Sequence, residues 1–191
     1  MTEVKWKPFH KIINGKLERG SLAYDAYQSE EQYLMHFSNE FIFKKEIEHM
    51  ERLSEKWYAP EVDKIDINKL MIYLPHHAWY NNLNHLLHEG RAPDNWKHQV
   101  NTIIEDLECA NIYKLNLFTH CFYLKEGTIH IIDCYGCVFP DEIVTFGQID
   151  PILSKQTRNL FLQFRGVDGI VNMKEAYRYS KVGDLWGLQN D

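Results

Sequence analysis

Apolar residues recur at spacings of three and four in two long segments of the chain, which is typical of amphipathic helices. The first segment covers residues 39–57, where Ser38 or Asn39 can cap the start and Pro60 stops the helix. Its apolar positions are Phe43, Ile47, Met50, Leu53 and Trp57. The second segment covers residues 94–110. Its apolar face consists of Trp96, Val100, Ile103, Ile104 and Leu107.

Shorter runs rich in β-branched and aromatic residues predict strands on both sides of the first helix. The candidates before the helix are residues 9–13, 22–27 and 32–37. Turn signals at Asn14-Gly15 and Gly20 separate them, so we predict a three-stranded meander. After the helix, the candidates are residues 62–67 and 69–74, and Pro75 ends the second.

A later pair of strands ends on a single acid. Residues 121–124 and 128–132 are strand-like, and Lys125-Glu126-Gly127 forms the turn between them. Asp133 follows the second strand directly. Because an unpaired buried charge is costly, a carboxylate at such a position is usually paired, hydrogen-bonded or bound to a metal. Asp133 is therefore a candidate functional residue.

The order of these elements predicts an α+β protein. Further helices are predicted at residues 81–88, 155–165 and 172–179. We expect a small antiparallel sheet lobe over residues 1–74, which includes the helix at 39–57. A short, mainly helical lobe then covers residues 75–191, and it contains a hairpin segment at residues 111–137.

Composition and charge narrow the choice of partners. The 191-residue chain is 45% hydrophobic, which allows a sizeable core, and its formal net charge is −6. No basic tract is long enough to form a nucleic-acid patch, so we expect no nucleic-acid partner. No apolar run is long enough to cross a bilayer, and the N-terminus lacks the apolar stretch of a signal peptide. Since the four cysteines also fit a reduced compartment, we expect a cytoplasmic protein with no membrane partner.

The element order and several local matches resemble the protein-kinase-like fold, in the broad sense that includes small-molecule kinases of the aminoglycoside and choline type. Residues 43–53 and 59–62 resemble the first large helix of that fold and the run into its next strand. Residues 69–75 resemble the last strand of the small lobe with the hinge, and residues 96–107 resemble the long helix before the catalytic loop. Residues 127–136 resemble the strand that delivers a metal-binding acid, with Asp-Cys-Tyr-Gly in place of Asp-Phe-Gly.

This resemblance covers roughly residues 20–140 and implies a site for ATP and Mg²⁺. Asp133 falls on the acid that holds Mg²⁺ against the nucleotide phosphates. Glu46 falls on the helix glutamate that pairs with a phosphate-contacting lysine, and its alternative role is a solvated helix acid. In kinases, a catalytic aspartate and then an asparagine precede the metal-binding acid.

The corresponding loop, residues 111–121, contains no aspartate, and two registers remain open. In the register that the spacing to Asp133 favours, Asn116 takes the aspartate position and His120 the metal-binding asparagine position. In the other, Asn111 and Asn116 keep the family's spacing of five. An asparagine can orient a hydroxyl but cannot accept its proton. Lys114 is expected either to neutralise phosphate charge from this loop or to lie on the surface.

The predicted small lobe departs further from the family. It has no glycine-rich loop of the kind that covers phosphates, and residues 32–37 contain no lysine. Two functions follow from these observations. The first is an atypical phosphotransferase that uses ATP and Mg²⁺ on a small-molecule substrate. The alternative is a non-catalytic kinase-like module that binds a ligand or a protein partner.

A zinc site is the competing interpretation of the same region. Cys134 and Cys137 form a Cys-x-x-Cys pair, and His120-Cys121 lies across the predicted hairpin. A single Cys-x-x-Cys pair is a weak signal, and a free cysteine in an apolar strand behaves as a small hydrophobe. We therefore expect Mg²⁺ rather than zinc.

Overall fold

The chain folds as a mixed α+β protein with a small antiparallel sheet and several helices, as the sequence predicts. The computed structural model describes residues 7–8, 10–13, 16–19, 24–28, 32–75, 78, 81–115, 119–149 and 155–182. The chain forms two compact units, each built from two stretches of sequence. The first unit comprises Met1–Ala92 and Phe122–Cys134, and the second comprises Pro93–Cys121 and Tyr135–Asp191.

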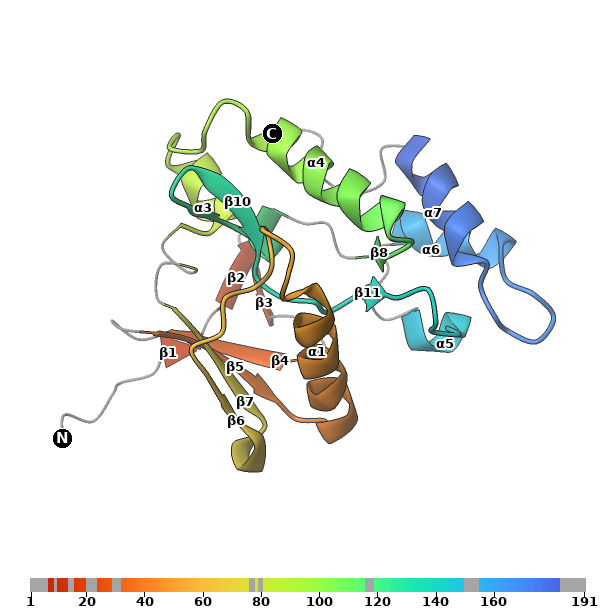
Figure 1. Cartoon of the computed structure of the whole chain (residues 1–191), viewed down its shortest axis with the longest axis horizontal. Coiled ribbons are helices and arrows are strands. Elements are labelled where there is room, and N and C mark those ends of the chain that lie inside the picture. Colours follow the sequence, from red (N-terminus) through yellow and green to blue (C-terminus); the bar gives the residue numbers. More distant parts are fainter. Residues whose placement is uncertain are drawn as a thin grey trace. The chain divides into compact units, whose positions relative to one another are not determined.

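The first unit contains a five-stranded sheet in which every pairing is antiparallel (Figure 1). Its strands are β1 (Lys7–Pro8), β4 (Tyr24–Gln28), β5 (Gln32–Phe37), β6 (Lys64–Asp66) and β7 (Met71–Pro75). Their order in the sheet is β1-β4-β5-β7-β6, which makes β5 the central strand. The short 3₁₀ turn η1 (Ile67–Lys69) connects β6 to β7.

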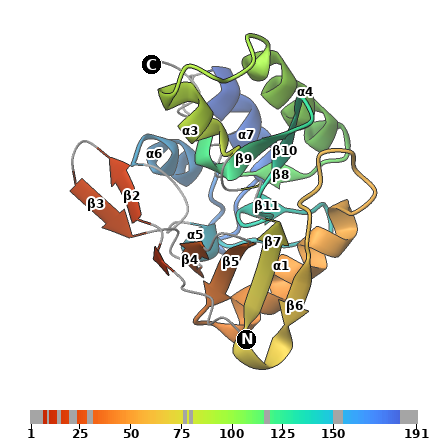
Figure 2. The same cartoon turned by 90° about the vertical axis from the view of Figure 1, so that its left-hand side faces the viewer.

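The predicted meander is wrong at its first strand. β2 (His10–Ile13) does not join β4 but pairs with β3 (Lys16–Arg19), and these two strands form a separate hairpin (Figure 2). The β3 segment, Lys-Leu-Glu-Arg, has a single apolar residue and therefore gave no strand signal. β4 and β5 pair as predicted, with Tyr24 opposite Phe37.

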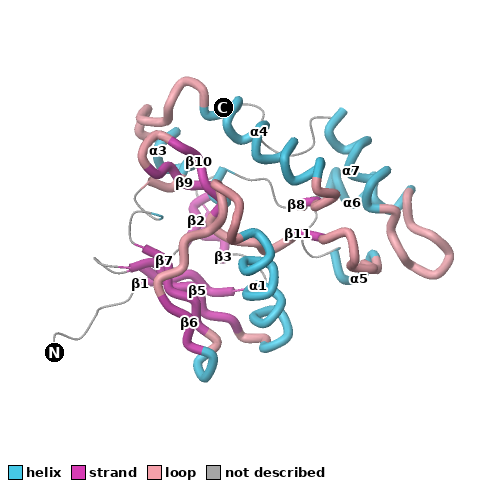
Figure 3. The backbone as a smooth tube through the Cα atoms, viewed as in Figure 1, coloured by secondary structure: helices cyan, strands magenta, loops and turns pink. Residues whose placement is uncertain are grey.

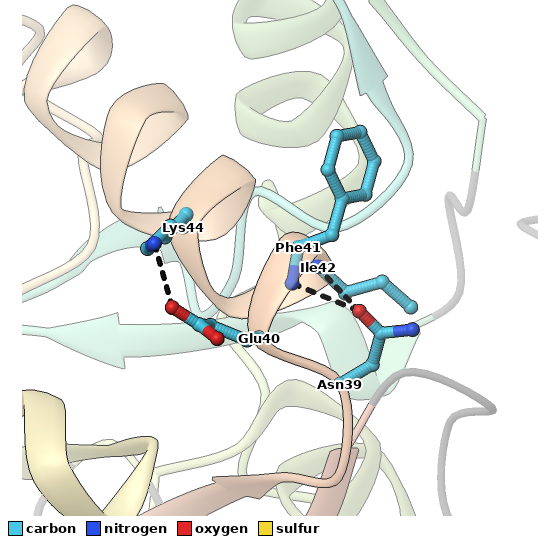
Figure 4. Close-up of polar contacts among 5 residues, drawn as sticks. All are labelled: Asn39, Glu40, Phe41, Ile42 and Lys44. Atoms are coloured by element: carbon cyan, nitrogen blue, oxygen red, sulfur yellow. Dashed lines mark hydrogen bonds and ion pairs between the residues drawn. The ribbon is translucent and has the colours of Figure 1, made fainter.

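Helix α1 (Glu40–Leu53) begins where the sequence predicts and ends earlier. The Asn39 side chain caps it by accepting hydrogen bonds from the backbone N–H groups of Phe41 at 2.9 Å and Ile42 at 3.2 Å (Figure 4). The predicted extension to Trp57 is wrong, because Ser54 already caps the C-terminal end. The buried residues of α1 are Phe43, Glu46, His49, Met50 and Leu53.

Strands β9 (Phe122–Lys125) and β10 (Thr128–Ile131) form the predicted hairpin in the first unit. Its two-residue turn has positive φ at both Glu126 (49°) and Gly127 (83°), as a type I′ turn requires. The hairpin is bonded to the rest of the unit at both strands. Leu124 N–H donates to the Asn81 carbonyl at 2.8 Å, and Ile131 N–H donates to the Tyr58 carbonyl at 3.0 Å. Helix α3 (Leu83–His88) lies beside β9 (Figures 1 and 2).

The second unit is mainly helical (Figure 3). Its helices are α4 (Trp96–Cys109), α5 (Phe146–Ile149), α6 (Lys155–Gln163) and α7 (Met173–Val182), with the 3₁₀ turn η2 (Thr119–Cys121). The short strands β8 (Tyr113–Lys114) and β11 (Cys137–Val138) pair with each other. α7 packs against β8, and the rings of Tyr113 and Tyr177 lie 5.2 Å apart.

Within the part of the chain that the structure describes, no helix combines the length and the apolar character needed to cross a membrane. The long helix α4 illustrates this, because its apolar residues are confined to one face. Val100, Ile103, Ile104 and Leu107 are buried there, while Lys97, His98 and Asn101 are exposed.

Candidate functional site

Asp133 lies two residues after the end of β10 and is 3% exposed. Its Oδ2 accepts a hydrogen bond from the Tyr24 hydroxyl at 2.6 Å. This distance is in the range of a strong O–H···O⁻ hydrogen bond. The contact joins two positions that are 109 residues apart in the sequence, both within the first unit. The acid that ends the hairpin is thus tied to the five-stranded sheet.

Aromatic packing holds the Tyr24 ring in place. Tyr24 is 8% exposed, and its ring lies 5.3 Å from the ring of its cross-strand neighbour Phe37. Phe37 in turn contacts Phe43 of α1 edge-to-face at 5.5 Å. Such tilted and edge-to-face pairs are favourable ring geometries. The phenol that reaches Asp133 therefore projects from a packed line of three rings across β4, β5 and α1.

Glu46 approaches the same segment from α1. Its Oε1 accepts a hydrogen bond from the Cys134 backbone N–H at 2.6 Å, and its side chain is 3% exposed. The alternative in which Glu46 is a solvated helix acid is therefore wrong. Because Asp133 and Cys134 are consecutive, α1 and β4 each contribute a side chain that binds this short stretch.

The two lysines nearest to Glu46 in the sequence form ion pairs along the helix surface. Lys44 Nζ lies 2.6 Å from Glu40 Oε1, and the side chains of both residues are about two-thirds exposed (Figure 4). The hydrogen bond and charge of Lys44 lower the pKa of Glu40. Lys45 Nζ lies 3.2 Å from Glu48 Oε2. Both lysines therefore form ion pairs with acids of their own helix.

Lys114 is fully buried in the second unit, so the expectation of a surface lysine is wrong. Its Nζ donates a hydrogen bond to the Tyr135 carbonyl at 3.1 Å. The next residue, Leu115, donates its backbone N–H to the Gly136 carbonyl at 2.8 Å. The backbone bond continues the β8–β11 pairing by one residue, and the Lys114 side chain holds the Tyr135 backbone within the second unit.

The remaining predicted site residues lie elsewhere. His120 is in η2 of the second unit and is partly exposed. Asn116 lies outside the described residues, so its predicted catalytic position stays a prediction. The structure therefore brings Glu46 to the backbone next to Asp133 in one unit and places Lys114 and His120 in the other.

The donor chemistry around Asp133 is compatible with Mg²⁺. Mg²⁺ binds hard oxygen ligands and is usually held by one or two carboxylates with phosphates and water. The hydrogen bond from Tyr24 occupies one of about four acceptor sites on a carboxylate. One buried carboxylate at the end of a strand therefore fits a metal whose other ligands come from a bound nucleotide.

The cysteines do not assemble a zinc site in the described part of the chain. All four are free, and Cys121, Cys134 and Cys137 are buried while Cys109 is exposed. Among the residues that the structure describes, no three His, Cys, Asp or Glu side chains cluster as metal ligands would. Cys134 contributes a backbone N–H to Glu46 instead.

Tyr24 is the functional candidate that the sequence analysis missed. In the sequence it is one residue of the strand predicted at 22–27, and nothing in the local pattern connects it to a carboxylate far along the chain. The available signal was a tyrosine at an inward-facing strand position, because a buried phenol needs a hydrogen-bond partner.

Comparison with known proteins identifies no relative from which a function could be proposed. No protein-family model matches the chain, and no curated protein matches it in sequence.

Proposed function

We propose that this chain is an atypical kinase-like protein that binds ATP with Mg²⁺ at Asp133 and transfers phosphate to a small-molecule substrate. The observation that carries the proposal is the position of Asp133, a buried carboxylate that follows a strand and is held by the Tyr24 hydroxyl at 2.6 Å. A buried acid at such a place is the feature that the resemblance assigns to the metal ligand.

The position of Glu46 gives separate support. The resemblance assigns it to the helix glutamate of the nucleotide site, and a glutamate in that role must face the interior. Glu46 is buried and bonded to the backbone immediately after Asp133. The antiparallel sheet of the first unit, with helix α1 between its strands β5 and β6 in the sequence, also supports the proposal.

Within this proposal, each described residue has a limited task. Asp133 would hold the metal, and Mg²⁺ would neutralise charge on the phosphates of the nucleotide. Glu46 anchors the backbone of Cys134 and so fixes where the Asp133 side chain starts. Since much of phosphoryl transfer depends on positioning and charge neutralisation, a site without a catalytic aspartate can still support turnover.

A second candidate is a non-catalytic kinase-like module that binds a ligand or a protein partner. A specific observation favours it, because Glu46 Oε1 accepts a hydrogen bond from a backbone N–H at 2.6 Å, which is a structural contact. Strand β5, which precedes α1, contains no lysine. In kinases the ion pair between a strand lysine and the helix glutamate must form for activity.

Calorimetric titration with ATP in the presence and absence of Mg²⁺ tests the metal site that the first candidate requires. We expect the wild-type protein to bind ATP more tightly with Mg²⁺, and Asp133→Asn to remove that metal dependence. Unchanged binding in Asp133→Asn would refute the assignment of the metal ligand. Asp63→Asn is a matched control, because Asp63 is exposed and lies in the same unit.

Phosphate transfer separates the two candidates. The purified protein is incubated with γ-labelled ATP, Mg²⁺ and a panel of small molecules with hydroxyl or amine acceptors. The phosphotransferase is supported if an acceptor becomes labelled in the presence of Mg²⁺ and if this labelling is lost in Asp133→Asn. Metal-dependent ATP binding without labelled acceptor or released phosphate supports the non-catalytic module.

A further inference from the structure

Tyr24 and Glu46 constrain two consecutive residues from two different elements. Tyr24 on β4 donates to Oδ2 of Asp133, and Glu46 on α1 accepts from the N–H of Cys134. One bond fixes the carboxylate itself and the other fixes the backbone that follows it. A segment needed only to end a strand does not require a fixed carboxylate orientation.

The Tyr24 side chain has little freedom to turn away. Its ring is packed against Phe37, which is packed against Phe43. All three residues are buried, and Phe37 and Phe43 are each 1% exposed. A tyrosine side chain has two rotatable χ angles, and this packing restricts both. The hydroxyl therefore reaches Asp133 from a pre-organised position.

We propose that Tyr24 is a positioning residue for a Mg²⁺–nucleotide complex, because its hydroxyl orients the Asp133 carboxylate towards the metal. This inference rests on the proposed function of Asp133 as the metal ligand. Carboxylates that bind metals are themselves hydrogen-bonded, and loss of such an outer partner typically weakens metal affinity about 10- to 100-fold. The bond to Oδ2 uses one acceptor site of the carboxylate and remains compatible with metal binding.

Tyr27 provides a matched control on the same strand. It is half-buried, and its ring lies 6.4 Å from the ring of His36. It is three residues from Tyr24 and so on the opposite face of β4, since side chains alternate along a strand. Tyr27→Phe removes the same hydroxyl from the same element without touching the Asp133 contact.

The test is calorimetric titration of wild type, Tyr24→Phe, Tyr27→Phe and Asp133→Asn with ATP, once with Mg²⁺ and once with a chelator. For Tyr24→Phe we expect the dissociation constant for MgATP to rise about 10- to 100-fold, with metal-free ATP binding unchanged. Tyr27→Phe should match wild type in both titrations. A purely structural role for Tyr24 would weaken the two kinds of binding equally.

Each other outcome has a definite meaning. If Asp133→Asn removes metal dependence while Tyr24→Phe binds MgATP as wild type does, the positioning role is wrong and the proposed function stands. If Tyr24→Phe binds MgATP more tightly, the hydroxyl competes with the metal and the inference is overturned. If the wild type binds no MgATP, or Asp133→Asn binds it unchanged, the proposed function fails and this inference fails with it. Thermal melting of each variant establishes that it is folded.

Discussion

At the residue scale, the candidate site is built around two buried acids whose hydrogen-bond donors are identified. Glu46 and Asp133 are each 3% exposed, and each accepts a hydrogen bond of 2.6 Å. Burial of a carboxylate is costly unless hydrogen bonds replace its hydration. The two short bonds therefore contribute to the stability of the first unit as well as to any site.

Replacement of Glu46 by alanine should destabilise the protein by about 1.5–3 kcal/mol, because it removes a buried hydrogen bond to an acidic side chain. Glu46→Gln keeps an oxygen acceptor for the Cys134 N–H and should cost less. Urea unfolding followed by circular dichroism measures the free energy of unfolding for each variant.

Glu48→Ala is the control for this series. Glu48 lies on the same helix, and its side chain is about half exposed and paired with Lys45 at 3.2 Å. Its loss should change stability by about 0.5 kcal/mol or less. An equal loss in Glu46→Ala and Glu48→Ala would show that the Glu46–Cys134 bond adds nothing to stability.

Residue-scale prediction from sequence succeeded for Asp133 as a buried, engaged acid and missed Tyr24, and for Lys114 burial excludes only the surface alternative. Asp133 was detectable because a charge directly after an apolar strand is unusual in itself. Tyr24 and Lys114 acquire their roles from partners that are 109 and 21 residues away. A hydrophobic pattern reports whether a side chain faces inward, and it carries no information about which distant atom that side chain will meet.

At the element scale, the β9–β10 hairpin has a regular register and a two-residue turn. Lys125 pairs with Thr128, so Glu126 and Gly127 alone form the turn. Both have positive φ, and this conformation suits Gly and Asn far better than Glu. Glu126 is therefore a site of local strain in an otherwise favourable turn.

Substitution of this turn should change stability in opposite directions at its two positions. Gly127→Ala should destabilise the protein by about 1–2 kcal/mol, because φ of +83° is unfavourable for a side chain. Space is not the cause, since a Cβ at Gly127 would meet no atom within 4 Å. Glu126→Asn should stabilise by about 0.5–1 kcal/mol by forming the preferred Asn-Gly turn.

Thermal unfolding of the two variants measures these effects side by side. Gly147→Ala is a suitable control, because Gly147 also has open space around its Cβ position and its φ is not in the left-handed region. If Gly127→Ala and Gly147→Ala shift the melting temperature equally, backbone strain is not the reason for glycine at position 127.

Prediction of elements was accurate where one face is strongly apolar and poor where it is not. α4 and the β9–β10 hairpin were found within two residues of their ends. The Lys16–Arg19 strand was missed, because a hairpin with mainly polar residues leaves no periodic signal. In α1, the inward face includes Glu46 and His49, so the predicted apolar stripe was rotated from the observed one.

At the scale of the whole molecule, the α+β class followed from the order of elements, while the composition of the two units did not. The sequence suggested a simple break near residue 74, whereas the hairpin at 122–134 belongs to the unit formed by the first 92 residues. Long-range hydrogen bonds, such as the one from Ile131 N–H to the Tyr58 carbonyl, hold the hairpin in the first unit. A contact between residues so far apart in the sequence leaves no local sequence pattern.

Each unit also buries a tyrosine whose ionisation opposes folding. Burial raises the pKa of Tyr123 in the first unit and of Tyr177 in the second well above the ordinary value of 10.0. The negative charge of Glu61 adds to the effect on Tyr123, and that of Glu108 adds to the effect on Tyr177. Below pH 10 both phenols are protonated in the folded and unfolded states. Above pH 10 the unfolded state loses protons that the folded state keeps, so stability falls as pH rises.

Tyr177→Phe should therefore resist alkaline unfolding better than the wild type. We expect similar free energies of unfolding at pH 7–9, followed above pH 10 by a difference that grows by at most roughly 1.4 kcal/mol per pH unit. Urea unfolding at pH 8, 10 and 11 measures this difference. Tyr179→Phe is the control, because Tyr179 is on the same helix and is 56% exposed. A parallel loss of stability in wild type and Tyr177→Phe across this range would contradict the assignment of alkaline sensitivity to the buried phenol.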